Sequence, residues 1–135
     1  MKGKTFLATA LGLMVSFATV FFFEWIGMKL FPVPKHTKPN NIEEWEAIMA
    51  TFPIGTFLSV ALGHGIGVFL GGITANRIDK HSIIGYLVIF LLMFVTTATN
   101  ALAYPHPTWF KIADIGAVLL GGLLAWRLLK WKKSN

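Results

Sequence analysis

The stretch 52–78 combines two properties that restrict what this chain can fold into. It is apolar over a length sufficient to cross a bilayer, and a small residue recurs at every fourth position along it. In lipid, such a ridge lets two helix backbones approach closely and gain dispersion contacts. The stretch therefore predicts a membrane-spanning helix that packs tightly on another helix. The residues of this predicted packing ridge are Gly55, Ser59, Gly63, Gly67, Gly71 and Ala75.

The composition places the whole chain in the membrane class. Of its 135 residues 55% are hydrophobic and only 13% are charged, and a soluble domain of this size could not bury that much apolar surface. The lack of cysteine excludes disulfides, thiolate metal sites and redox-active thiols. The net charge of +6 comes from Lys and Arg between and after the apolar runs, so we infer no nucleic-acid partner from it.

Four apolar runs predict an all-α fold, a bundle of four transmembrane helices that forms a single integral membrane domain over residues 1–135. The first run is longer than the core of a secretory signal peptide, and no small-residue cleavage site follows it. Proline pairs end the first and third runs, because proline cannot continue a helix. We expect the four helices at residues 5–30, 53–78, 82–103 and 108–129.

A polar segment between the first two runs predicts a short amphipathic helix at residues 41–51. Asn41 can cap its first turn, and Glu44 three residues later completes a capping-box pattern. We expect the helix to lie on the outer membrane surface, with an ordinary solvated loop helix as the alternative. Its apolar face consists of Ile42, Trp45, Met49 and Phe52.

The distribution of basic residues predicts the orientation of the chain. With both termini in the cytoplasm, the outer side carries only Lys29, Lys35, Lys38 and Lys111. The positive-inside rule favours this topology, N-in and C-in, because the inner side is richer in Lys and Arg. The basic residues of that inner side are Lys2, Lys4, Arg77, Lys80, Arg127, Lys130, Lys132 and Lys133.

The second and fourth predicted helices share a motif near their inner ends. The segments 71–77 and 121–127 match as GGxxAxR, and the helices before them both end in aromatic-Pro-x-Pro. The pattern predicts two repeated helical hairpins related by an axis along the membrane normal, with the second and fourth helices packed on each other or on copies in another subunit. Chance agreement is the alternative, since small residues are common in membrane helices. The fourth helix carries its own small ridge at Ala113, Ala117, Gly121 and Ala125.

His64 lies about 16 Å along the second helix by the helical rise, near the middle of the bilayer. An ionisable residue at that depth is a candidate for proton relay or for a metal site. The alternative is a neutral histidine that donates one hydrogen bond to a neighbouring helix.

Further polar residues are expected near the outer membrane boundary. Together they could bind a cation or pass a proton if they converge, which the sequence does not show. The alternative is a set of interfacial side chains that reach water. Asp114 is the strongest candidate, because it lies one turn inside its helix. The residues are Glu24, Asn100, His106 and Asp114.

Several of these elements together resemble a family of small uncharacterised bacterial four-helix integral membrane proteins. They are Glu24 before the aromatic-Pro-x-Pro loop, Pro53, the glycines of 63–72, Asn100, and the motif PHPxW at 105–109. The resemblance covers most of the chain. It implies four spans in a bacterial inner membrane, and it implies no activity.

Three functions fit these residues. The first is a non-enzymatic protein that acts through helix packing, as an accessory subunit of a larger membrane complex or as a homo-oligomer. The second is a small oligomeric transporter or channel for a proton, a cation or a small solute, along a path past Glu24, His64, Asn100 and Asp114. The third is a membrane-embedded enzyme that uses His106 and Asp114, although the signatures HExxH, GxSxG and the Walker loop are missing. No cofactor is predicted.

Overall fold

The computed structural model describes the backbone of residues 2–133 and the side chains of residues 3–129. That part of the chain contains helices and no strand, which confirms the predicted all-α class. The helices are α1 (Lys2–Leu30), α2 (Ile42–Met49), α3 (Ile54–Ile78), α4 (Ile84–Ala103) and α5 (Thr108–Lys133). Among the basic residues used to predict orientation, the side chains of Lys2, Lys130, Lys132 and Lys133 lie outside the described residues.

All four long helices contain a segment that is long and apolar enough to cross a membrane. Their outward surface carries many large apolar side chains, among them Phe21, Leu91 and Leu120. In lipid such a surface is favourable, and the helical backbone satisfies its own hydrogen bonds. This is the construction of a multi-pass membrane protein. The segments are Gly3–Leu30, Ile54–Ile78, Ile84–Ala103 and Thr108–Leu129.

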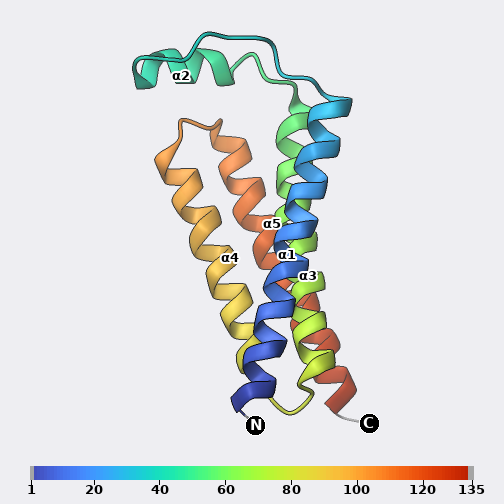
Figure 1. Ribbon diagram of the computed structural model, residues 1–135. Helices are drawn as coiled ribbons and strands as arrows, with labels where there is room; N and C mark the ends of the chain where they lie inside the picture. The colour runs from blue at the N-terminus through green and yellow to red at the C-terminus, as the bar shows by residue number, and fades with distance from the viewer. Residues whose placement is uncertain (1, 134–135) are drawn as a thin grey trace.

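The long helices form an up-and-down bundle with both termini at one end and α2 across the other (Figure 1). We call these the terminal end and the α2 end. α1 and α3 reach further towards α2 than the hairpin of α4 and α5, whose loop lies beneath α2 (Figure 1). α3 is the central helix, because it contacts α1, α4 and α5 and its contacts with α1 and α5 are the most extensive in the bundle.

The predicted ridge of α3 faces α1. A Cβ added at Gly67 would lie 2.9 Å from the carbonyl oxygen of Ser16, and one at Gly71 would lie 2.6 Å from that of Gly12. Larger side chains would therefore force the two helices apart, so the ridge is occupied within the chain. Towards the α2 end the same contact pairs Gly63 with Val20, Ser59 with Gly27 and Gly55 with Phe31.

A second small-residue side of α3 faces α5. A Cβ added at Gly65 would lie 2.8 Å from the carbonyl oxygen of Ala117, and one at Gly121 would overlap the backbone of Gly65. Further along, Ala125 is fully buried, whereas Ala113 at the start of the α5 ridge is half-buried. The second and fourth membrane helices are thus a close pair. Their contact uses Gly65 of α3, whereas the predicted ridge of small residues at every fourth position packs on α1.

Two buried hydroxyl groups link the helices through backbone carbonyls. Ser16 of α1 donates to the carbonyl oxygen of Gly67 at 2.9 Å, and Tyr86 of α4 donates to that of Gly122 in α5 at 2.8 Å. In an apolar medium a hydroxyl without a partner is costly, so these contacts fix which helix faces which.

The predicted short helix is present as α2, and Asn41 caps it. The Oδ1 of Asn41 accepts a hydrogen bond from the backbone N–H of Glu44 at 2.8 Å. The carboxylate of Glu44 accepts from the N–H of Asn40 at 2.7 Å, so the returning half of the capping box is displaced by one residue from the prediction. Met49 on the predicted apolar face is buried, while Ile42 remains 71% exposed. Only the later part of that face covers the bundle.

A buried histidine–aspartate pair as candidate functional site

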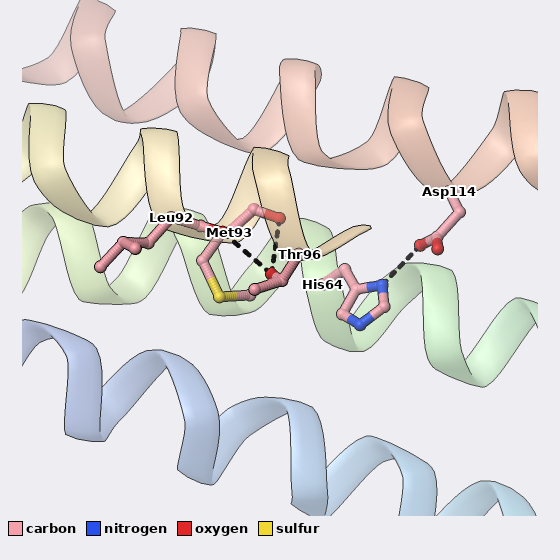
Figure 2. A network of polar contacts seen from close by, with 5 residues as sticks. All are labelled: His64, Leu92, Met93, Thr96 and Asp114. Carbon is pink, nitrogen blue, oxygen red and sulfur yellow. Dashed lines mark hydrogen bonds and ion pairs between the residues drawn. The ribbon is translucent and has the colours of Figure 1, made fainter. Parts of the chain in front are cut away.

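α3 and α5 bring His64 and Asp114 together inside the bundle. The Nδ1 of His64 lies 2.6 Å from the Oδ1 of Asp114, and the side chains are 13% and 1% exposed respectively. Figure 2 shows the imidazole on α3 pointing to the carboxylate on α5. A charged carboxylate only accepts hydrogen bonds, so with Asp114 ionised the Nδ1–H of His64 is the donor.

The contact depends on how the two hairpins are offset. His64 lies further along α3 than Asp114 along α5, but α5 begins deeper in the bundle because the α4–α5 hairpin is shorter (Figure 1). The close approach at Gly65 and Ala117 then brings the two side chains within reach. The sequence analysis gave His64 no partner at its depth and placed Asp114 nearer the outer boundary; the structure corrects both points.

The pair retains unused hydrogen-bonding capacity. The second carboxylate oxygen of Asp114, Oδ2, is buried and has no partner among the described residues. Elsewhere, on α4, the hydroxyl of Thr97 is also buried without a partner among the described residues. Buried polar atoms are rarely left unpaired, and in a membrane protein such groups are candidates for binding a proton or a cation. Thr96 differs, because its hydroxyl donates to the carbonyl oxygens of Leu92 and Met93 in its own helix (Figure 2).

Two phenylalanines separate the pair from the α2 end. The rings of Phe57 on α3 and Phe110 on α5 lie 4.9 Å apart between centroids, and both side chains are buried. Phe57 comes before His64 in α3, and Phe110 comes one turn before Asp114 in α5. We call this apolar layer the aromatic seal.

His106 lies on the other side of the aromatic seal, in the α4–α5 loop. Its ring centroid is 5.0 Å from that of Phe110, and both of its nitrogens are buried without a partner among the described residues. Burial lowers the pKa of His106, Lys111 lowers it further, and Asp114 acts in the opposite direction. His106 is therefore held as a neutral histidine next to the aromatic seal.

Aromatic contacts continue from the α4–α5 loop to α2. The ring of Tyr104 lies 6.0 Å from His106 and 6.4 Å from Trp45 of α2. The ring of Phe52, at the end of the segment that follows α2, stacks 6.0 Å from Phe57. The segment after α2 thus contacts the aromatic seal, and α2 itself contacts the α4–α5 loop.

Towards the terminal end, backbone contact closes the site. The approach of Gly65 to Ala117 and Gly121 leaves no room for side chains between α3 and α5. We call this contact the small-residue seam. Along the bundle, the pair lies between the aromatic seal and the small-residue seam.

Glu24 and Asn100 do not join this site. Glu24 is half-buried on α1 and Asn100 is half-buried on α4, and neither side chain makes a hydrogen bond to another described residue. Among the described residues, no group of three His, Cys, Asp or Glu side chains could hold a metal ion. The residues predicted for one polar pathway therefore separate into the pair, a buried histidine near it and two isolated side chains.

The sequence analysis missed the unpaired hydroxyl of Thr97 and the aromatic seal. Thr97 shares the buried side of α4 with Met93 and Ala101, and that helical spacing would have identified it. The seal carried no such signal, because an apolar residue in an apolar helix does not reveal which neighbour it faces.

His64 and Asp114 also occupy equivalent positions of the predicted repeat. They lie 50 positions apart, the same separation as between Gly71 and Gly121, the first residues of the two GGxxAxR motifs. α3 and α5 run in the same direction through the bundle. Two parallel helices related by an axis along the membrane normal meet at equivalent residues, so this contact is the one that a two-hairpin repeat would produce.

Comparison with protein-family models, with curated proteins and with solved structures finds no match to this chain. The resemblance to small bacterial four-helix membrane proteins stays a prediction. Function is therefore inferred from the chemistry of the site.

Proposed function

We propose that the protein is a small membrane transporter or channel that moves protons, with His64 and Asp114 as the groups that bind and release them. The observation that carries this proposal is a fully buried carboxylate that shares a 2.6 Å hydrogen bond with an imidazole across two membrane helices. Ionisable side chains are expensive at membrane depth, and they occur there mainly in proton relays and ion paths.

The pair can change its proton content while it stays hydrogen-bonded. As imidazolium and carboxylate it has no net charge, and the loss of the proton from Nε2 leaves one negative charge. An apolar surrounding penalises that charge, so a proton must return or another cation must take its place at Oδ2. A site of this kind exchanges protons with whichever side of the membrane it can reach.

The aromatic seal and the small-residue seam suggest how access to the pair could alternate between the two ends of the bundle. Separation of Phe57 from Phe110 would connect Asp114 to the α2 end, and separation of α3 from α5 at the small-residue seam would connect it to the terminal end. Rocking of the α4–α5 hairpin against α1 and α3 would open them in turn. In a bacterial inner membrane with both termini in the cytoplasm, the α2 end would face outwards.

The direct test is proton flux in vesicles that contain the purified protein and a pH-sensitive dye, driven by a potassium diffusion potential. The wild type should acidify or alkalise the lumen faster than empty vesicles. His64→Gln and Asp114→Asn keep hydrogen-bonding shape and remove titration, so each should lower the flux about tenfold or more. Thr96→Val is the matched control, because that hydroxyl is satisfied within α4.

Two results would contradict the proposal. One is wild-type flux no greater than that of empty vesicles under an inward or outward potential. The other is unchanged flux in both pair variants while both remain folded by circular dichroism.

A groove beside the α3–α5 contact favours a second function, assembly with another copy of the chain. It has a volume of about 220 Å³ and small residues line it, including Ala61 and Gly65. In lipid, helices associate where small residues permit close approach. A transporter with so few helices would also gain a longer polar path from a second subunit.

The natural chain has no cysteine, so one introduced at the exposed rim of the groove can report on assembly. Leu62→Cys should give a disulfide-linked dimer in oxidised membranes, and Leu7→Cys on the exposed surface of α1 should not. Equal cross-linking at both positions, or none at either, would contradict assembly through this groove.

A further inference from the structure

A separate pocket of about 600 Å³ opens at the terminal end, between α1 and the start of α4. Thr5 and Phe6 line it on α1, Asp79, His81 and Ser82 line it on the α3–α4 loop, and Ile84 lines it on α4. It lies at the opposite end of the bundle from α2 and shares no residue with the proton site.

The pocket is polar on one side and apolar on the other. The loop supplies a carboxylate, an imidazole and a hydroxyl, whereas Phe6 and Ile84 are exposed apolar walls. Both walls lie near the ends of the apolar segments that begin at Gly3 and Ile84, so the pocket sits at the boundary between membrane and water. A molecule that fills it needs a polar head and an apolar tail.

Asp79 is the anionic group of the pocket. It is 5% exposed, and its Oδ2 accepts a hydrogen bond from the hydroxyl of Thr5 at 2.6 Å. That hydrogen bond lowers the pKa of Asp79, burial opposes the shift, and a backbone hydrogen bond at His81 and the nearby charges of Lys4 and His81 lower it as well. The carboxylate is therefore ionised at neutral pH.

Basic residues lie near this carboxylate. Lys80 and His81 follow it directly in the loop, and Lys4 lies one residue before its partner Thr5. The first turn of α4 adds the positive end of a helix dipole at Ile84, whose N–H donates to the Ser82 hydroxyl at 3.3 Å. A buried negative group among positive ones complements a zwitterion that carries an ammonium next to a phosphate.

We propose that this pocket binds phosphatidylethanolamine from the leaflet at the terminal end. The ammonium, with its three N–H donors, contacts the carboxylate of Asp79, and the phosphate lies against His81, next to which Lys80 stands in the chain. An acyl chain follows the apolar walls at Phe6 and Ile84. The choline headgroup carries no N–H donor and is bulkier, so it meets the carboxylate less well. The bound lipid would bridge α1 and the start of α4 at the terminal end.

The test is native mass spectrometry of the purified full chain in detergent, titrated with phosphatidylethanolamine or with phosphatidylcholine of the same acyl chains. The wild type should retain the ethanolamine lipid about five- to tenfold more than the choline lipid. Asp79→Asn keeps an acceptor for Thr5 but removes the charge, and should abolish that preference. Thr5→Val removes the hydrogen bond and keeps the carboxylate, so it should retain the preference.

Equal retention of the two lipids by the wild type would overturn the proposal, as would an unchanged preference in Asp79→Asn. Stronger retention of phosphatidylglycerol than of phosphatidylethanolamine would also overturn it, because the basic residues alone would then account for binding. Melting temperatures of the two variants show whether each one is folded during the titration.

Discussion

α3 meets its two main neighbours in different ways. Against α1 it presents a continuous line of small residues, and the polar link between them is the Ser16 hydroxyl bonded to a backbone carbonyl. Against α5 it combines the approach at Gly65 with a side-chain pair of His64 and Asp114 that leaves a carboxylate oxygen unpaired. Both contacts rest on close approach of the helix backbones. At the α1 contact the hydroxyl of Ser16 has its hydrogen-bond partner, whereas at the α5 contact one carboxylate oxygen of Asp114 has none. We infer that the α1–α3 contact is the scaffold of the bundle and that the α3–α5 contact holds the candidate site.

The largest effect is expected at the α1–α3 contact. Gly71→Leu places a side chain against the carbonyl oxygen of Gly12, 2.6 Å from where its Cβ would lie, so α1 must move away. We expect a loss of about 3 kcal/mol or more in the free energy of unfolding, or no folded protein. Thermal unfolding in detergent measures it. Gly116→Leu is the matched control, because a Cβ there meets nothing within 4 Å.

If both glycine variants melt at the wild-type temperature, the contact between α1 and α3 is not the scaffold that the comparison requires. If both are equally destabilised, the effect comes from the loss of glycine itself and not from the helix contact.

A smaller effect is expected when the pair is broken from one side. His64→Leu leaves Asp114 buried without its hydrogen-bond partner, at a cost of about 3 kcal/mol. Adding Asp114→Leu removes the unpaired group, so the double variant should recover most of the lost stability and still lack proton flux. A double variant that is less stable than His64→Leu would show that the pair matters for packing more than for charge.

The smallest effect is a pH dependence that belongs to His106. Its pKa is lowered by burial, so between its lowered value and the ordinary 6.5 the unfolded chain binds a proton that the folded chain does not. Stability should therefore rise with pH through that window, and the rise should be the smallest of these effects. Melting temperatures of wild type and His106→Phe between pH 5 and 8 measure this pH dependence. The range is chosen because an ordinary histidine titrates within it. An identical slope in both proteins would assign the pH dependence to another group.

The sequence was sufficient for the elements but not for their partners. Apolar length predicted the four membrane helices, and the cap at Asn41 predicted where α2 begins. Periodicity also identified which residues share a side of α3, because spacing along one helix is local information. Which neighbour each side faces depends on the other helices. The ridge therefore turned out to face α1, while the second and fourth membrane helices meet at Gly65.

The candidate site shows the same limit. Counting residues from the start of each helix assumed that all helices begin at one level, which placed His64 and Asp114 at different depths. The α4–α5 hairpin reaches less far towards α2, so α5 begins deeper in the bundle and the difference is cancelled (Figure 1). The unpaired Oδ2 and the seal of Phe57 and Phe110 are properties of packing, so no pattern within a single helix contains them.

The most direct test of the account is to exchange the two members of the pair. His64→Asp alone and Asp114→His alone each place two like groups together, and both variants should lose proton flux in reconstituted vesicles. The double exchange restores an imidazole next to a carboxylate, and we expect it to recover most of the wild-type flux. Flux that survives in either single variant, or a folded double exchange that stays as inactive as both, would contradict the claim that the contact between His64 and Asp114 moves the proton.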